Sequence, residues 1–207
     1  MNLHFSRTDV RILEQQRVYQ GHFQLDRLKL QYRLFKGGWS QPLLREIFER
    51  GEAVGILLFD PERNKIVLIE QFRAGIVLKT GNPWLIEIVA GMIDGNESLK
   101  EVAKRETQEE TGLTLHNLSF ISRHWVSPGA STERITLYCG QVDSSQAQGF
   151  HGLANEGEDI RLHVLTVQKA YYLLNTGEID NASTIIALLW LQQHETVVRK
   201  IWSNKAS

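Results

Sequence analysis

Residues 91–113 read GMIDGNESLKEVAKRETQEETGL, and this stretch decides the fold. Ser98 followed three residues later by Glu101 forms a capping box, which is a typical start of a helix. Gly112 suits the position just past a helix C-terminus, because glycine adopts the left-handed conformation without strain. The stretch therefore predicts a helix over about Leu99–Thr111.

The predicted helix has two unlike faces. Leu99, Val102 and Ala103 form an apolar stripe at 100° per residue, and this stripe should face the core. The next positions on the same stripe are three carboxylates, namely Glu106, Glu109 and Glu110. The opposite face is predicted to be solvated and carries Lys100, Glu101, Lys104, Gln108 and Thr111.

Three clustered and partly desolvated carboxylates repel one another and raise each other's pKa values. Arg105 can neutralise one of them at the edge of the stripe. A divalent cation can neutralise the others, and Mg²⁺ fits best because no His or Cys stands at ligand spacing. A glutamate-rich helix usually presents a solvated face, but here other residues already occupy that face. We therefore interpret the acidic face as a metal site.

At these residues the sequence resembles the Nudix box, which is G, five residues, E, seven residues, then R-E-U-x-E-E-x-G-U with U usually aliphatic. Gly91, Glu97 and residues 105–113 match every fixed position, and Thr107 departs from the aliphatic preference. The resemblance implies an α+β protein, the Nudix α/β/α sandwich. It also implies an enzyme that uses Mg²⁺ or Mn²⁺ to hydrolyse a nucleoside diphosphate linked to another group.

Carried over by position, the resemblance implies a set of metal ligands. The predicted ligands are Ala90, through its backbone carbonyl, Glu106, Glu109, Glu110 and Glu158. Metal ions that bridge two phosphates neutralise the diphosphate, stabilise charge in an in-line displacement and lower the pKa of the attacking water.

Three further features resemble the ADP-ribose pyrophosphatase branch of this family. Pro128 lies 15 positions after Leu113, a sheet containing residues 44–51 precedes the core, and one strand ends in the run EQFR at residues 70–73. The match extends from about residue 10 to about residue 195. The resemblance implies hydrolysis of ADP-ribose to AMP and ribose 5-phosphate.

Two other functions are weighed against this one. A related NDP-sugar hydrolase, for instance one acting on GDP-mannose, has a closely similar architecture. A non-catalytic Nudix domain that only binds nucleotide or a protein partner belongs to a different class, and such domains usually lose box carboxylates. None of the box carboxylates is missing here.

The branch takes its general base from an acidic loop, and residues 155–160, NEGEDI, match that loop. In isolation such a run is more often a solvated acidic loop. A flexible loop that contains glycine can deliver a base to its water on closure. The predicted catalytic residues are Glu156 as general base, Glu158 as a further metal ligand, and Glu109. The division of roles between Glu156 and Glu158 stays open.

The resemblance also implies a substrate site. A guanidinium can grip a phosphate bidentately or stack on a base. Glu133 matches a position that contacts the terminal ribose, and His22 stands where relatives place an aromatic residue for adenine stacking. The predicted substrate-binding residues are His22, Arg45, Glu46, Arg50, Arg73, Met92, Ser127 and Glu133.

The chain is predicted to have two parts. Residues 1–50 are expected to form an antiparallel β-sheet subdomain, because residues 27–34 alternate apolar and polar side chains and residues 36–39 suit a turn. Residues 51–207 are expected to form the Nudix hydrolase domain. A three-stranded sheet with one polar face is only marginally stable alone. We therefore expect a homodimer, and the resemblance implies that the sheet swaps between subunits.

Strands and helices alternate irregularly after residue 52, which favours an α+β or α/β sandwich over a doubly wound sheet. The expected strands cover residues 53–59, 65–72, 84–90, 114–126, 134–142 and 160–167. Besides the acidic helix, the expected helices cover about 167–175 and 181–195.

Composition sets the outer limits. The 207 residues are 42% hydrophobic and carry 23 Lys+Arg against 24 Asp+Glu, a balance that argues against a nucleic-acid partner. The charge balance is compatible with a small anionic partner such as a nucleoside diphosphate sugar. The single cysteine, Cys139, excludes an intramolecular disulfide or a multi-cysteine zinc site. We find no signal peptide in the first ten residues and no apolar run of membrane length, so no membrane partner and a cytoplasmic location are expected.

Overall fold

The computed structural model describes residues 4–203, so residues 1–3 and 204–207, at the outer ends of the two predicted parts, lie outside the described residues. The chain divides into two compact units. Unit 1 comprises Met1–Glu52 and Trp125–Arg134, and unit 2 comprises Ala53–His124 and Ile135–Ser207.

Unit 1 contains a three-stranded antiparallel sheet in the order β1 (Val10–Gln20), β2 (Gln24–Tyr32), β3 (Leu43–Glu49). A 3-10 turn, η1 (Arg7–Asp9), precedes it. Between β2 and β3 the chain turns through Gly37 and Gly38, which take φ angles of +91° and +80°. Both angles lie in the region that favours glycine. Residues 125–134 join the sheet, because the Phe48 N–H donates to the Ala130 carbonyl at 2.7 Å.

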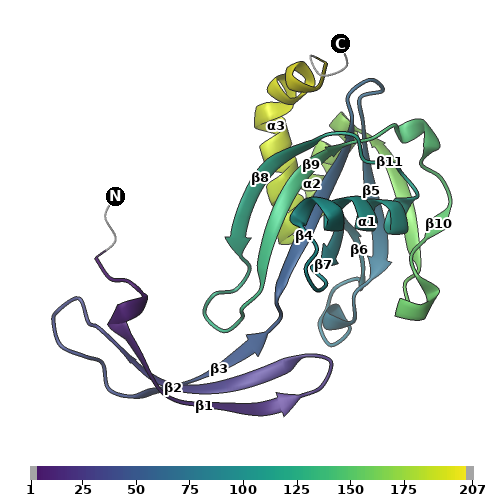
Figure 1. Cartoon of the computed structure of the whole chain (residues 1–207). Coiled ribbons are helices and arrows are strands. Elements are labelled where there is room, and N and C mark those ends of the chain that lie inside the picture. The colour runs from purple at the N-terminus through teal and green to yellow at the C-terminus, as the bar shows by residue number, and fades with distance from the viewer. Residues whose placement is uncertain (1–3, 204–207) are drawn as a thin grey trace. The chain divides into compact units, whose positions relative to one another are not determined.

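Unit 2 is built on a large sheet (Figure 1). Its strands run in the order β10 (Phe150–His151), β11 (Ile160–Thr166), β5 (Lys65–Phe72), β4 (Glu52–Asp60), β9 (Arg134–Gln141), β8 (Leu118–Trp125). Off this path, β6 (Trp84–Glu87) pairs with β5, and β7 (Val89–Met92) pairs with β4. The helices are α1 (Leu99–Thr111), α2 (Val167–Thr176) and α3 (Ala182–Ser203), with single turns η2 (Ala74–Ile76), η3 (Ser144–Gln146) and η4 (Ala154–Glu156).

The core of unit 2 has two layers, one on each face of the sheet. Alternate residues of β5 enter different layers: Leu68 packs with α2 and α3, whereas Val67 and Ile69 pack with Val102 and Ala103 of α1. Helix α1 therefore covers one face and α2 and α3 cover the other (Figure 1). This arrangement confirms the predicted α+β class and the α/β/α sandwich.

Three element boundaries differ from the prediction. The strand expected over residues 84–90 is two strands, β6 and β7, because the chain breaks at the buried Ile88, whose N–H donates to Thr184 Oγ1 at 3.0 Å. The strand expected from residue 114 begins at Leu118. The last helix continues to Ser203, where Trp202 is buried against the core. Within residues 4–203, no helix has the length and apolar character needed to cross a membrane.

Candidate active site

Helix α1 begins and ends where the sequence predicts. The Ser98 hydroxyl accepts from the Glu101 N–H at 3.4 Å, and the Glu101 carboxylate accepts from the Ser98 N–H at 2.8 Å. At the other end Gly112 takes a φ of +67°, and its N–H donates to the Gln108 carbonyl at 2.9 Å. The caps set where the helix starts and stops, and the packing of Val102 and Ala103 into the core sets which face points inward.

The buried face of α1 carries the predicted stripe. Val102 and Ala103 are fully buried, and the stripe continues into Glu110, which is only 2% exposed. The side chain of Glu106 is mostly buried and that of Glu109 is more open. The prediction was wrong for Thr111, which was expected on the solvated face but is buried at 1% exposure. Its hydroxyl donates to a backbone carbonyl one turn earlier, at 2.5 Å, so burial leaves no unpaired donor.

Thr107, the departure from the aliphatic preference of the box, is fully buried. Its hydroxyl donates to the Ala103 carbonyl at 2.7 Å. With that donor satisfied, the side chain fills an apolar position without leaving a polar group unpaired.

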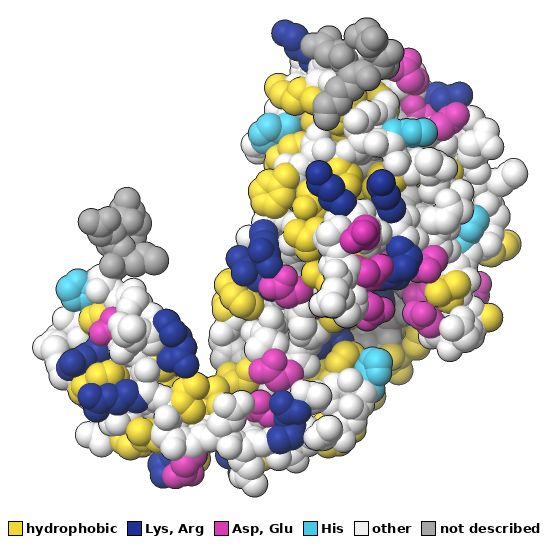
Figure 2. Space-filling view, in the orientation of Figure 1, with side chains coloured by type: hydrophobic (Ala, Val, Ile, Leu, Met, Phe, Trp, Pro, Cys, Tyr) yellow, Lys and Arg dark blue, Asp and Glu magenta, His cyan; other side chains and the backbone are white. Residues whose placement is uncertain are grey.

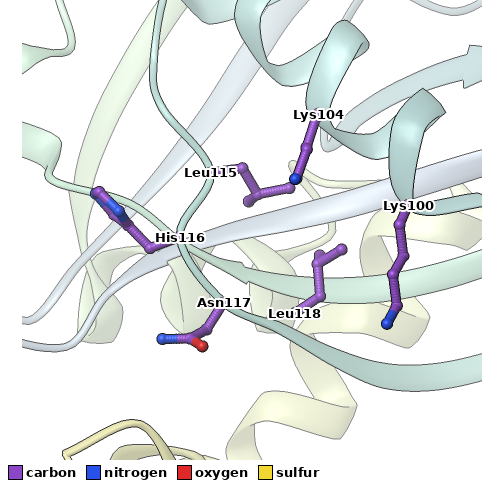
Figure 3. Close-up of a pocket in the computed structure, with 6 residues that line it drawn as sticks. All are labelled: Lys100, Lys104, Leu115, His116, Asn117 and Leu118. Atoms are coloured by element: carbon purple, nitrogen blue, oxygen red, sulfur yellow. The ribbon is translucent and has the colours of Figure 1, made fainter. Parts of the chain in front are cut away.

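The outer face of α1 carries Lys100 and Lys104, and Figure 2 shows acidic and basic side chains close together over this helix. The two lysines line a pocket of about 260 Å³ with Leu115 and with residues 116–118. Figure 3 shows that the side chain of His116 points away from both lysines. We assign no ligand to this pocket.

Glu110 is the carboxylate with the least support from its surroundings. Its Oε2 accepts one hydrogen bond, from the Ala90 N–H at 3.2 Å. Burial raises the pKa of Glu110 to about 9, and the negative charges of Glu106 and Glu158 add to that rise, whereas the Ala90 N–H and Arg73 oppose it. A carboxylate held this way is stabilised as an anion only when positive charge arrives beside it.

Glu106 lies directly against the backbone of Gly91. A Cβ atom built on Gly91 would stand 1.7 Å from Glu106 Oε1, so any larger residue would displace the carboxylate. Burial raises the pKa of Glu106, and the charges of Glu109 and Glu158 add to the rise. The sequence showed Gly91 only as a fixed letter of the motif. Its packing role requires the strand β7 to run beneath the helix, which no local signal reveals.

Arg105 supplies more compensation than the sequence predicted. Its guanidinium donates to both carboxylate oxygens of Glu97, at 3.0 and 3.1 Å. It also donates to Glu106 at 2.7 Å and to Glu109 at 3.0 Å, so it bridges three carboxylates rather than neutralising one. Arg105 consequently holds the pKa of Glu97 below its usual value. A further bond to the Met92 carbonyl, at 3.3 Å, ties the helix to the end of β7.

The acidic loop brings Glu158 to this cluster. Glu158 accepts from the Leu153 N–H at 3.1 Å, and its charge acts on both Glu106 and Glu110. Glu156 lies in the turn η4 and is exposed. The loop is anchored to α1 where the Gly152 N–H donates to the Glu109 carbonyl at 3.4 Å.

Two more predicted residues of unit 2 border the carboxylates. Arg73 follows the end of β5, forms an ion pair with Glu87 at 2.7 Å, and acts electrostatically on Glu110. Met92 ends β7 and leaves its side chain exposed. Unit 2 thus brings together seven of the predicted site residues besides the exposed Glu156. They are Arg73, Ala90, Met92, Glu106, Glu109, Glu110 and Glu158, of which Glu109 lies at the edge.

Other predicted substrate contacts lie in unit 1. Arg50 forms an ion pair with Glu133 at 3.2 Å, and its guanidinium lies over the ring of Phe23 at 4.3 Å. His22 is exposed and its ring meets that of Phe23 edge to face at 4.5 Å. Phe23, the residue after His22, therefore connects His22 to Arg50 through ring contacts.

The remaining three residues of the prediction, Arg45, Glu46 and Ser127, also lie in unit 1. Arg45 of β3 donates to the Leu44 carbonyl at 2.8 Å, and Glu46 accepts from Arg27 at 3.1 Å. Ser127 begins the short turn in which its carbonyl accepts from the Ser131 N–H at 2.9 Å.

The chemistry of the donor set fits a divalent cation. Glu106, Glu110 and Glu158 offer only oxygen ligands, and the charge of Glu158 adds to the raised pKa values of Glu106 and Glu110. Glu110 has a single hydrogen-bond donor. As the side chains stand, no group of three or more His, Cys, Asp or Glu within residues 4–203 is arranged to hold a metal ion. Arg105 occupies Glu106 and Glu109 instead.

Comparisons with known proteins give matches over most of the chain. The family model for the NUDIX domain matches residues 49–188. An ADP-ribose pyrophosphatase of Escherichia coli (strain K12) is 44% identical over 199 residues, which are 96% of this chain and 95% of that protein. One of Haemophilus influenzae is 41% identical over 204 residues, covering 97% and 94%.

More distant relatives are named as pyrophosphatases of a different nucleotide sugar. A GDP-mannose pyrophosphatase of Enterobacter sp. is 33% identical over 151 residues, which are 72% of this chain and 77% of that protein. A solved structure described as an ADP compounds hydrolase superposes with a TM-score of 0.73 at 20% identity, covering 94% of this chain and 99% of that one, and supports the fold. With a family match that spans most of its length, this chain belongs to the NUDIX family.

Proposed function

We propose that this protein is a Mg²⁺-dependent hydrolase that cleaves the diphosphate of ADP-ribose to AMP and ribose 5-phosphate. The observation that carries the proposal is the buried carboxylate face of α1, where Glu110 keeps one hydrogen bond and a pKa raised to about 9. The substrate is chosen from the relatives: ADP-ribose pyrophosphatases match nearly the whole chain at 41–44% identity, whereas GDP-mannose pyrophosphatases match about three quarters at 32–33%.

The residues that would hold the metal are Glu106, Glu110 and Glu158, with Glu109 and the Ala90 carbonyl as further ligands. A bound Mg²⁺ supplies charge neutralisation of the diphosphate and lowers the pKa of the attacking water. Arg105, which contacts Glu97, Glu106 and Glu109, keeps the carboxylates apart and oriented before the cation arrives.

Proton transfer falls to the acidic loop. Glu156 is exposed and accepts no bond from Leu153, whereas Glu158 does, so Glu156 is the more mobile carboxylate of the two. Gly157, with a φ of +73°, gives the loop a flexible point between them. We assign Glu156 as the general base that takes the proton of the attacking water, because a mobile base can move to its water.

Substrate binding is assigned to arginines and their neighbours. Arg73, beside Glu110, is positioned to grip a phosphate oxygen, and Met92 offers an exposed apolar contact. In unit 1, Arg50 and Glu133 form one polar pair for ribose and phosphate, and His22 offers a ring for the base. Arg45, Glu46 and Ser127 complete the proposed set.

We also propose a homodimer. Unit 1 leaves large apolar side chains uncovered on its sheet, among them Leu44 at 62% exposure, with Ile12 and Tyr19 also exposed. Such exposed apolar groups on a small sheet are typical of an interaction surface. Light scattering at micromolar concentration should give twice the mass of the chain. A monomer at that concentration would contradict the proposal.

A substrate panel tests the activity. Purified protein with Mg²⁺ is assayed against ADP-ribose, GDP-mannose and other NDP-sugars, and we expect ADP-ribose to give the highest kcat/KM. GDP-mannose is the second candidate because its hydrolases share a third of their matched sequence with this chain. A much higher kcat/KM for another NDP-sugar would overturn the substrate assignment. Binding without turnover of any compound would overturn the enzymatic assignment itself.

A further inference from the structure

Gln71, near the end of β5, has a buried amide that lacks hydrogen-bond partners. The residue is 6% exposed, and its Nε2 is buried with no acceptor within the described residues. A buried amide donor without an acceptor loses its bonds to water and gains nothing in exchange, which is why such groups are rare in proteins. The amide is therefore either a defect of the core or one half of an interaction that needs a bound molecule.

The alternation of β5 tells which face Gln71 occupies. Leu68 belongs to the core layer under α2 and α3, whereas Val67 and Ile69 belong to the layer under α1. Successive strand residues point to opposite faces, so Gln71 shares the face of Val67 and Ile69. The amide thus lies on the side of the sheet that α1 covers.

Its neighbours on that face belong to the carboxylate site. Gln71 pairs with Leu85 of β6, and on the other side Arg161 of β11 pairs with Glu70, so Ile160 is the residue beside Gln71. Two residues before Ile160 comes Glu158, and two residues after Gln71 comes Arg73. In this antiparallel pairing both residues lie beyond Gln71 in the same direction along the strands, and both act electrostatically on Glu110. The amide therefore lies two residues along the strands from two groups that border the buried carboxylate.

The carboxylates of the site do not satisfy this amide. Glu110 takes its bond from Ala90, Glu158 from Leu153, and Glu106 from Arg105. No acceptor for the amide lies within the described residues, and the molecule that the site is proposed to receive carries non-bridging phosphate oxygens that can accept from it. We propose that Gln71 Nε2 donates a hydrogen bond to the diphosphate of the substrate, which makes Gln71 a substrate-binding residue. This inference rests on the proposed function.

The test uses Gln71→Met, which keeps the length of the side chain and removes the amide. Dissociation constants are measured by calorimetry in EDTA, without turnover, for ADP-ribose and for inorganic diphosphate. Loss of one hydrogen bond to a charged acceptor should weaken both ligands about ten-fold or more. Because Met leaves no unpaired buried donor, the Tm of the ligand-free variant should equal or exceed that of the wild type. Gln71→Glu replaces donors by an acceptor and should weaken both ligands further.

Gln141→Met is the matched control. Gln141 is a partly buried glutamine of β9 whose amide oxygen accepts from Asn117 at 2.7 Å, so its replacement should lower the Tm and leave both dissociation constants unchanged. Wild-type affinity in Gln71→Met overturns the inference, whatever its Tm. A loss confined to ADP-ribose overturns the assignment to the diphosphate. Failure of the proposed function itself appears separately, as absent turnover of ADP-ribose by the wild-type protein.

Discussion

Asp60 and Glu110 are two carboxylates of unit 2 that are equally buried but differ in the number of hydrogen bonds they accept. Asp60, at the end of β4, is 1% exposed and accepts from the N–H groups of Arg63 and Ser144 at 2.9 and 2.8 Å. The Ser144 hydroxyl at 2.6 Å and the Arg63 guanidinium at 3.3 Å complete four donors. Glu110 is 2% exposed and has one donor, the Ala90 N–H.

Their pKa values move in opposite directions for this reason. Burial raises the pKa of a carboxyl group, but at Asp60 the hydrogen bonds outweigh burial and hold its pKa below the usual value. At Glu110 the single hydrogen bond does not outweigh burial, and the pKa rises to about 9. Burial alone therefore does not mark a functional carboxylate. We propose that a functional carboxylate is marked by burial together with few hydrogen-bond donors and nearby carboxylates.

The largest effect is expected at Glu110. Replacing it by Gln keeps the shape and the acceptor for Ala90 but removes the charge proposed to bind Mg²⁺. We expect kcat/KM for ADP-ribose to fall on the order of 10³-fold, since metal charge stabilisation contributes several kcal/mol to the transition state. In EDTA at neutral pH the Tm should rise, because the wild-type carboxyl group, with its raised pKa, must take up a proton on folding and the Gln side chain need not.

Glu101→Gln is the control for that variant. It lies on the same helix, and the capping box tolerates Gln at this position, so both kcat/KM and Tm should remain near wild type. A Glu110→Gln protein with near-normal turnover in Mg²⁺ would refute the role of Glu110.

A smaller loss of activity is expected from Gly91→Ala, which tests Glu106, the neighbour of Glu110 on the same face of α1. The added Cβ must displace the Glu106 carboxylate, and we expect a loss of activity of about 10–100-fold. Gly75→Ala adds a methyl group into open space and should leave activity unchanged. Equal rates for both variants would show that the position of Glu106 does not matter.

Asp60→Asn should affect stability and not chemistry. The amide replaces one acceptor by a donor and cannot satisfy four donors, so we expect the free energy of unfolding to fall by about 2 kcal/mol. Urea titration followed by tryptophan fluorescence measures this loss. The kcat/KM of the folded variant should remain within about two-fold of wild type. A large loss of activity in the folded Asp60→Asn protein would contradict the assignment of Asp60 to stability alone.

The smallest effect is a pair of opposite pH slopes. A lowered folded-state pKa means that Asp60 contributes stability above its ordinary pKa of about 3.8 and loses it as the pH falls below that value. A raised pKa means that metal-free Glu110 lowers stability as the pH rises from about 4.5 towards 9. The urea midpoint is measured as a function of pH. Asp60→Asn should remove part of the fall in midpoint below about pH 3.8, and Glu110→Gln part of the fall between about pH 4.5 and 9. Parallel pH profiles in all three proteins would contradict both assignments.

Local signals predicted α1 to the residue. The capping box at Ser98 and the glycine at position 112 act within one turn of the helix ends, so all the interacting residues are close together in the sequence. The same periodicity placed Glu106 and Glu110 on the buried face. The metal ligands and substrate contacts taken from the resemblance stay predictions.

What the sequence could not show depends on partners far along the chain. The break between β6 and β7 follows a bond from Ile88 to Thr184, 96 residues away. The unpaired amide of Gln71 is visible only once β6 and β11 enclose it. Thr111 was misplaced because its hydroxyl bonds back to the Thr107 carbonyl and can then be buried, which angular periodicity does not consider.

The double capping of α1 has a consequence for how this sequence can vary. With Ser98 and Gly112 fixing both ends, a residue inserted between Val102 and Glu106 would turn every later side chain by about 100° around the helix. Glu106, Glu109 and Glu110 would leave the sheet together, and no single substitution could return them. Substitutions on the outer face leave the geometry untouched. This helix can therefore evolve by replacement, whereas changes of length are tolerable only in the turns outside it.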